Sequence, residues 1–191
     1  RLRGIDLYYE LQGAGPRLLL CNGSGGTIAG AGPMIQRLAT RFEVLIHDQR
    51  CLGRTSIPAA VPTMADYAAD AAALLDQVGW PTALVFGISF GGMVAQEFAV
   101  TWPERVERLA LLCTSPGGDG GSSYPLHSVA SLPVDEQEAL RLRLADSRYN
   151  AEFLAAHPFD QRLVDFATAA RALPKSVEQA RGEAMQLEAR A

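Results

Sequence analysis

Apolar and polar positions along this chain follow patterns that change from one segment to the next. Short, continuous apolar runs are typical of strands buried on both faces of a sheet, and they occur at residues 17–21, 42–47, 82–86 and 106–113. Residues 5–11 predict a further strand, which could pair with residues 1–3 across Gly4. The segments between the later runs predict helices at residues 33–41 and 93–101.

The helix after residue 63 has the clearest pattern. Thr63 can accept a hydrogen bond as its N-cap, and Asp66 stands at the third helical position, as in a capping box. Gly79 is placed to end the helix. The apolar residues between them recur at steps of three and four and share one face: Met64, Tyr67, Ala71, Leu74 and Val78.

This alternation predicts an α/β fold with a doubly wound, mostly parallel sheet. Residues 1–115 are expected to carry the sheet, and the glycine-rich stretch 115–123 a loop or linker. From residue 116 to residue 191 only helical patterns follow, at 134–148, 151–156, 160–172 and 176–190, which we interpret as a helical lid. The remaining strands of such a core are expected to lie outside these 191 residues.

Composition narrows the class of protein. Apolar residues make up 48% and charged residues 20%, which is typical of a globular domain with a core. The net charge of −4 and the scattered arginines argue against nucleic acid as a partner, and no apolar run is long enough to span a membrane. Three cysteines without a CxxC pair predict reduced thiols in a cytoplasmic protein and no zinc site. The opening residues do not resemble a signal peptide, although a removed one is left open.

The segment Gly87-Ile88-Ser89-Phe90-Gly91 matches the pattern G-x-S-x-G between a predicted strand and a predicted helix. A sharp strand-to-helix turn puts the serine in a strained backbone conformation, and side chains on either flank would clash. Glycine at positions 87 and 91 avoids those clashes. The simpler alternative is that Ser89 only caps the following helix.

Two further segments, together with this turn, resemble the α/β-hydrolase family. Residues 22–26, Asn-Gly-Ser-Gly-Gly, resemble the family's oxyanion loop, with Asn22 where histidine is usual. Residues 47–56 resemble its D-x-R-G-x-G-x-S turn, with Cys51 where glycine is usual. Within the family, the chain is most similar to the 3-oxoadipate enol-lactonase and esterase branch.

The resemblance implies a small-molecule substrate, a carboxylic ester or lactone, and no metal or cofactor. Ser89 would attack the acyl carbon, while the backbone N–H groups of Ser24 and Phe90 would stabilise the oxyanion. The glycines at positions 23, 25, 87 and 91 would shape the two loops. Asp48 and Arg50 are expected to hold their own loop by hydrogen bonds.

The family's triad continues with an acid and then a histidine, and neither has a clear counterpart here. His47, His127 and His157 are weak candidates for the base, and Asp119 is a weak candidate for the acid. We therefore expect both groups to come from a further segment of the chain or from a second chain.

Three interpretations remain open at this stage. The first is ester or lactone hydrolysis. The second is other chemistry on the same scaffold, such as C–C bond hydrolysis or cofactor-free perhydrolysis. The third is a non-catalytic domain, either a ligand-binding protein or an inactive, truncated hydrolase.

Overall fold

The computed structural model describes residues 1–117, 129, 132–172 and 174–189. Contacts within the chain divide it into two compact units. The first unit comprises Arg1–Ser123 and Val177–Ala191, and the second comprises Tyr124–Ser176. The sheet and the residues of the candidate site belong to the first unit.

The sheet has five strands in the order β1-β3-β2-β4-β5. Their bounds are Tyr9–Gln12, Arg17–Cys21, Glu43–His47, Ala83–Ile88 and Val106–Leu112 for β1 to β5. Strand β1 runs antiparallel to β3, and the other neighbours are parallel, so the predicted fold class is confirmed. From β2 the chain first adds β3 on one side and later β4 on the other. The carboxyl ends of β2 and β4 therefore flank a topological switch point, where sheets of this kind bind ligands.

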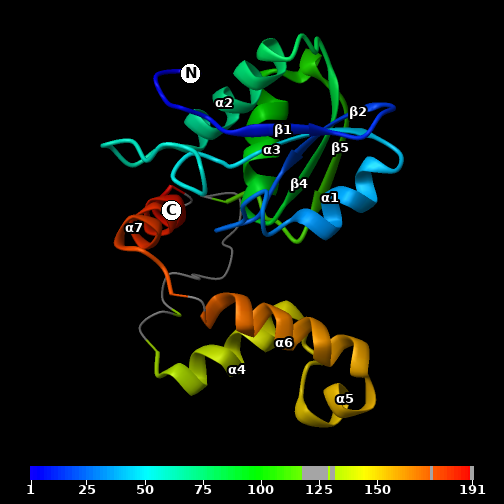
Figure 1. The fold of residues 1–191 in the computed structure, drawn as a ribbon, viewed down its shortest axis with the longest axis vertical. Helices are drawn as coiled ribbons and strands as arrows, with labels where there is room; N and C mark the ends of the chain where they lie inside the picture. The colour runs from blue at the N-terminus through cyan, green and yellow to red at the C-terminus, as the bar shows by residue number, and fades with distance from the viewer. Residues whose placement is uncertain (118–128, 130–131, 173, 190–191) are drawn as a thin grey trace. The chain divides into compact units, whose positions relative to one another are not determined.

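Helices cover both faces of the sheet (Figure 1). Helix α1 (Gly32–Ala39) packs on one face, where Ile35 and the apolar side chains of β2 and β3 form a core. Helices α2 (Met64–Gln77) and α3 (Phe90–Thr101) pack on the other face, where Tyr67, Leu74 and Phe98 belong to the larger core. A short 3₁₀ helix, η1 (Pro103–Arg105), leads into β5.

In the sheet unit, the predicted starts of two elements are wrong by three residues or more. Helix α3 begins at Phe90 rather than at residue 93, because tertiary packing keeps Gly91 and Gly92 helical despite their low intrinsic propensity. Strand β1 is confined to Tyr9–Gln12, and the expected pairing across Gly4 is a single bridge between Leu2 and Ile5.

The second unit is helical where the structure describes it. It contains α4 (Val134–Ala145), α5 (Ala151–Ala156) and α6 (Pro158–Ala172). Helix α7 (Val177–Glu188), which the sequence pattern places with these helices in one segment from residue 116, belongs to the sheet unit instead. The reason is close packing: Gly182 lies against the carbonyl of Cys51 with no room for a side chain. Among the described helices, none has the length and apolar character needed to cross a membrane.

The start of α2 offers a test of the local sequence signal. The capping box is present: the Thr63 side chain accepts from the Asp66 N–H, and the Asp66 carboxylate accepts from the Thr63 N–H. We expect Thr63→Ala to lower the free energy of unfolding by about 1 kcal/mol, because one N–H of the first turn loses its acceptor. Chemical denaturation measures this change. Thr101→Ala, at the exposed end of α3, is the matched control and should stay within about 0.5 kcal/mol of the wild type.

Candidate active site

Ser89 occupies a strained position between β4 and α3. Its backbone angles are φ 52° and ψ −118°, a combination that few residues other than glycine adopt. Strand β5 and the loop after it hold this conformation, since the Ser89 N–H donates to the Leu112 carbonyl at 2.8 Å. The Thr114 hydroxyl donates to the Ser89 carbonyl at 2.8 Å. Strain that is held by several surrounding contacts is a feature of functional sites.

The glycines beside Ser89 are required by close packing. A side chain at Gly87 would place its Cβ 2.5 Å from the Gly91 carbonyl oxygen and 2.7 Å from the Ala95 methyl group. A side chain at Gly91 would overlap the carbonyls that end β2, those of Cys21 and Asn22. The turn after β4 therefore lies directly against the end of β2.

The Ser89 side chain does not cap the helix that follows it. Ser89 is the N-cap residue of α3, yet no side-chain capping hydrogen bond is present. The alternative that Ser89 serves merely as a cap would need such a bond, so the geometry does not support simple capping. The hydroxyl remains available at the amino end of α3, where the helix dipole favours negative charge.

Residues 23–26 form a tight turn beside Ser89. The Gly26 N–H donates to the Gly23 carbonyl at 3.0 Å, and Gly25 alone of the two central residues has a positive φ, +69°. These features define a type II turn, which favours glycine at that position. A Cβ placed on Gly23 would lie 3.5 Å from the Ser89 Cβ, so this loop approaches the serine closely.

Most N–H groups of this turn already have acceptors. Gly23 donates to the Asn22 side chain at 2.9 Å, and Gly25 donates to the Gln186 side chain at 2.8 Å. Within the described part of the chain, nothing accepts from the Ser24 N–H. The same holds for the Phe90 N–H, which lies in the first turn of α3, where the helix itself supplies no acceptor. The two N–H groups expected to face an oxyanion are thus both free to donate.

Buried side chains fix the surroundings of these two N–H groups. Phe90 is buried and packs edge-on against Tyr67, with ring centroids 5.0 Å apart. Gln49 is buried and donates from Nε2 to the Asn22 carbonyl at 2.6 Å. Neither Gln49 nor Gln186 was predicted from the sequence, because no local motif marks a glutamine that bonds to a distant loop.

Asp48 joins the segment after β2 to the turn after β3. One carboxylate oxygen accepts from the Ile28 N–H at 2.7 Å, and the other accepts from the Arg54 N–H at 2.9 Å. The Thr55 hydroxyl donates to the Asp48 carbonyl at 2.6 Å. Asp48 therefore holds the loop by hydrogen bonds, as expected, and a side chain at Gly53 would collide with its carboxylate.

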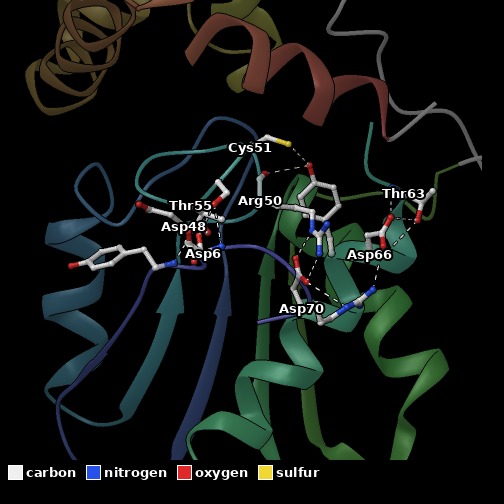
Figure 2. A network of polar contacts seen from close by, with 12 residues as sticks. Asp6, Asp48, Arg50, Cys51, Thr55, Thr63, Asp66 and Asp70 are labelled. Carbon is white, nitrogen blue, oxygen red and sulfur yellow. Dashed lines mark hydrogen bonds and ion pairs between the residues drawn. The ribbon is translucent and has the colours of Figure 1, made fainter. Parts of the chain in front are cut away.

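Arg50 anchors the same turn to α2. Its guanidinium makes two parallel hydrogen bonds to the Asp70 carboxylate, at 2.5 and 2.6 Å, and both side chains are buried. Arg3 lies 3.8 Å from the same carboxylate and also pairs with Asp66, at the start of α2 (Figure 2). The hydrogen bond to Asp70 raises the pKa of Arg50, so the guanidinium stays charged. The expected structural role of Arg50 is confirmed by these contacts.

Comparison with known proteins decides the family. The sequence profile described as the alpha/beta hydrolase fold matches residues 16–179. The chain belongs to the alpha/beta hydrolase fold family. The relatives include a pimeloyl-[acyl-carrier protein] methyl ester esterase of Chromobacterium violaceum, 34% identical over 69% of this chain and 49% of that protein. RutD of Azorhizobium caulinodans, whose name proposes a carbamate hydrolase, is 36% identical over 60% of this chain and 43% of its own length.

A solved structure shares the fold over nearly the whole chain. The enol-lactonase of Burkholderia xenovorans superposes with a TM-score of 0.70 and 21% identity, over 99% of this chain and 71% of that one. This chain therefore spans less than half the length of the curated relatives and about 70% of the enol-lactonase.

Two positions depart from the usual pattern of this α/β hydrolase family. Asn22 stands where histidine is usual, and its Oδ1 accepts from the Gly23 N–H at 2.9 Å. Cys51 stands where glycine is usual and keeps the positive φ, 76°, that favours glycine. Its thiol is buried, 4.0 Å from the Tyr67 hydroxyl, and burial raises the pKa of Cys51, so this thiol is a packing group rather than a nucleophile.

Of the candidate bases predicted from the sequence, the structure describes His47 and His157. His47 is buried at the end of β3, which β2 separates from β4, and burial lowers the pKa of His47 to about 4. His157 lies in the second unit, where its ring stacks on Phe153 and its Nδ1 lies 2.7 Å from the Phe153 carbonyl oxygen. His127 and Asp119 lie outside the described residues. In the part of the chain that the structure describes, no three His, Cys, Asp or Glu side chains gather as metal ligands.

The buried ion pair of this α/β hydrolase offers a sharp stability test. Asp70→Asn removes the charge opposite Arg50 in a buried position, so we expect the free energy of unfolding to fall by about 3–5 kcal/mol. Asp76→Asn is the matched control in the same helix. The Asp76 side chain is 68% exposed, against 1% for Asp70, and also pairs with an arginine, Arg105. Replacing Asp76 should lower the free energy of unfolding by less than about 1 kcal/mol. Equal losses in denaturation experiments would contradict the anchoring role of Arg50 and Asp70.

Proposed function

We propose that this chain is the nucleophile-bearing part of a serine hydrolase that acts on a small carboxylic ester or lactone. The observation that carries the proposal is the geometry at Ser89: a strained, uncapped serine beside two N–H groups, those of Ser24 and Phe90, that have no acceptor among the described residues. Membership of the α/β hydrolase family and a relative named as a methyl ester esterase support the choice of substrate class.

In the proposed reaction, the Ser89 hydroxyl attacks the acyl carbon and gives its proton to a general base. The two N–H groups stabilise the negative charge that develops on the acyl oxygen. Each lowers the free energy of the transition state by about 3 kcal/mol. The base returns the proton to the leaving alcohol. Water then attacks the acyl group on Ser89 and loses a proton to the base. The bond between the acyl carbon and Ser89 Oγ breaks, the base returns that proton to Oγ, and the carboxylic acid leaves.

We propose that the base and the acid come from a segment or chain other than residues 1–191. In the described residues, β5 pairs only with β4, and its apolar side chains remain accessible: Leu109, Leu111 and Leu112 are 40–50% exposed. Beside them a groove of about 410 Å³ on the α1 face is lined mainly by apolar side chains of β2, β4 and β5. An apolar edge of this kind is usually covered in a stable protein. The greater length of the enol-lactonase supports the same view.

The first test is the nucleophile itself. In the full-length protein, we expect Ser89→Ala to reduce hydrolysis of p-nitrophenyl acetate by about 10⁴-fold or more and to abolish labelling by a fluorophosphonate. Thr101→Ala, on the surface of the following helix, should leave both unchanged. Labelling of the Ser89→Ala protein to the same extent as the wild type would exclude Ser89 as the nucleophile.

The second test addresses the donor at position 24. Proline is favoured at the first central position of a type II turn, so Ser24→Pro fits the turn. It removes the hydroxyl and replaces the N–H hydrogen with a ring methylene. We expect kcat to fall by about 10²–10³-fold, the usual effect of losing one oxyanion donor. Ser24→Ala keeps the N–H, so its kcat should fall no more than a few-fold. Equal kcat values for the two variants would contradict the assignment of the Ser24 N–H.

A further inference from the structure

Gln186 links α7 to the oxyanion loop across 161 positions of the chain. Its side chain is completely buried, and its Oε1 accepts from the Gly25 N–H at 2.8 Å. Its Nε2 is buried with no partner in the described residues. A buried donor without an acceptor destabilises a fold. A methionine would fill a similar volume without that cost, so stability alone does not account for a glutamine here.

The hydrogen bond acts on the one peptide group of the turn that can change direction. Type I and type II turns differ by a flip of the central peptide, here the one joining Ser24 to Gly25. Gly25 tolerates both forms because it lacks a side chain. An acceptor fixed in α7 favours the form in which the Gly25 N–H points toward it.

Helix α7 is held firmly enough to act as that fixed point. Gly182, one turn before Gln186, packs against the Cys51 carbonyl, and Arg181 donates to the Pro58 carbonyl at 3.5 Å. At the other end of the oxyanion loop, Gln49 donates to the Asn22 carbonyl at 2.6 Å. Two buried glutamines from different segments therefore hydrogen-bond to the loop on either side of Ser24, one at Asn22 and the other at Gly25.

We propose that Gln186 is a positioning residue: by bonding to the Gly25 N–H it holds the turn of residues 23–26 in one conformation, and so keeps the neighbouring Ser24 N–H in place beside Ser89. By accepting from the Gly25 N–H, Gln186 occupies the neighbouring donor and fixes the loop before substrate binds. This inference rests on the proposed function, since positioning an oxyanion donor has meaning only if Ser89 forms an acyl-enzyme. The residue acts through the loop and touches no reacting atom.

The test compares two substitutions in the full-length protein. Gln186→Met keeps the shape and removes the acceptor, whereas Gln186→Glu keeps an oxygen that can accept in either protonation state. For p-nitrophenyl acetate we expect Gln186→Met to lower kcat about 10–100-fold with KM changed less than about 3-fold, since the loss falls on the transition state. Gln186→Glu should recover most of kcat. Val177→Ala, at an 88% exposed position of the same helix, is the control and should match the wild type.

If Gln186→Met does not fold, hydrogen exchange tests the role of Gln186 instead. Hydrogen exchange of the Gly25 amide should be slow in the wild type and in Gln186→Glu, although Gly25 is an exposed loop residue. Fast exchange in the wild type would overturn the inference. So would a wild-type kcat in Gln186→Met, or equal losses in Gln186→Met and Gln186→Glu, which would indicate packing alone. A wild-type protein that neither hydrolyses the ester nor reacts with a fluorophosphonate would instead refute the proposed function, and the inference with it.

Discussion

The close approach of α3 to the end of β2 is the constraint on which the site depends. Gly91 lies so near the carbonyls of Cys21 and Asn22 that no side chain fits between them. This contact brings the loop after β2 within reach of the turn after β4, at the point where the strand order of the sheet reverses. Ser89 then has to take up a positive φ to join the strand to the helix, and Leu112 of β5 and Thr114 in the loop after it hold it there.

The polar residues around this contact form a scaffold that fixes backbone N–H groups. Asp48 bonds to the N–H groups of Ile28 and Arg54, while Arg50 joins the same turn to α2 through Asp70. Gly23 and Gly25 also donate to side chains, those of Asn22 and Gln186. Within the described residues, the Ser24 and Phe90 N–H groups have no acceptor and lie beside Ser89, so both can donate to a bound group. Preorganised donors of this kind need no rearrangement when charge develops.

Much of the fold followed from the sequence because its signals are local. Periodicity located the strands and helices of the sheet unit, and the capping box at Thr63 gave the start of α2. The G-x-S-x-G turn located Ser89, and a family resemblance drew attention to Ser24. Long-range contacts have no local motif that could predict them. Gln186 bonds to Gly25 across 161 positions of the chain, and α7 packs on the sheet unit through Gly182. The helix start at Phe90 was also missed, because packing overrides the weak propensity of two glycines.

The most direct test of the account is the environment of the Ser89 hydroxyl in a crystal structure of the full-length protein. The account predicts a histidine from outside the present sequence with a ring nitrogen about 3 Å from Ser89 Oγ, itself oriented by a carboxylate. It also predicts an open space bounded by the N–H groups of Ser24 and Phe90. A Ser89 hydroxyl with no imidazole in reach, or one bonded to the first turn of α3, would contradict the central claim that this serine is a nucleophile.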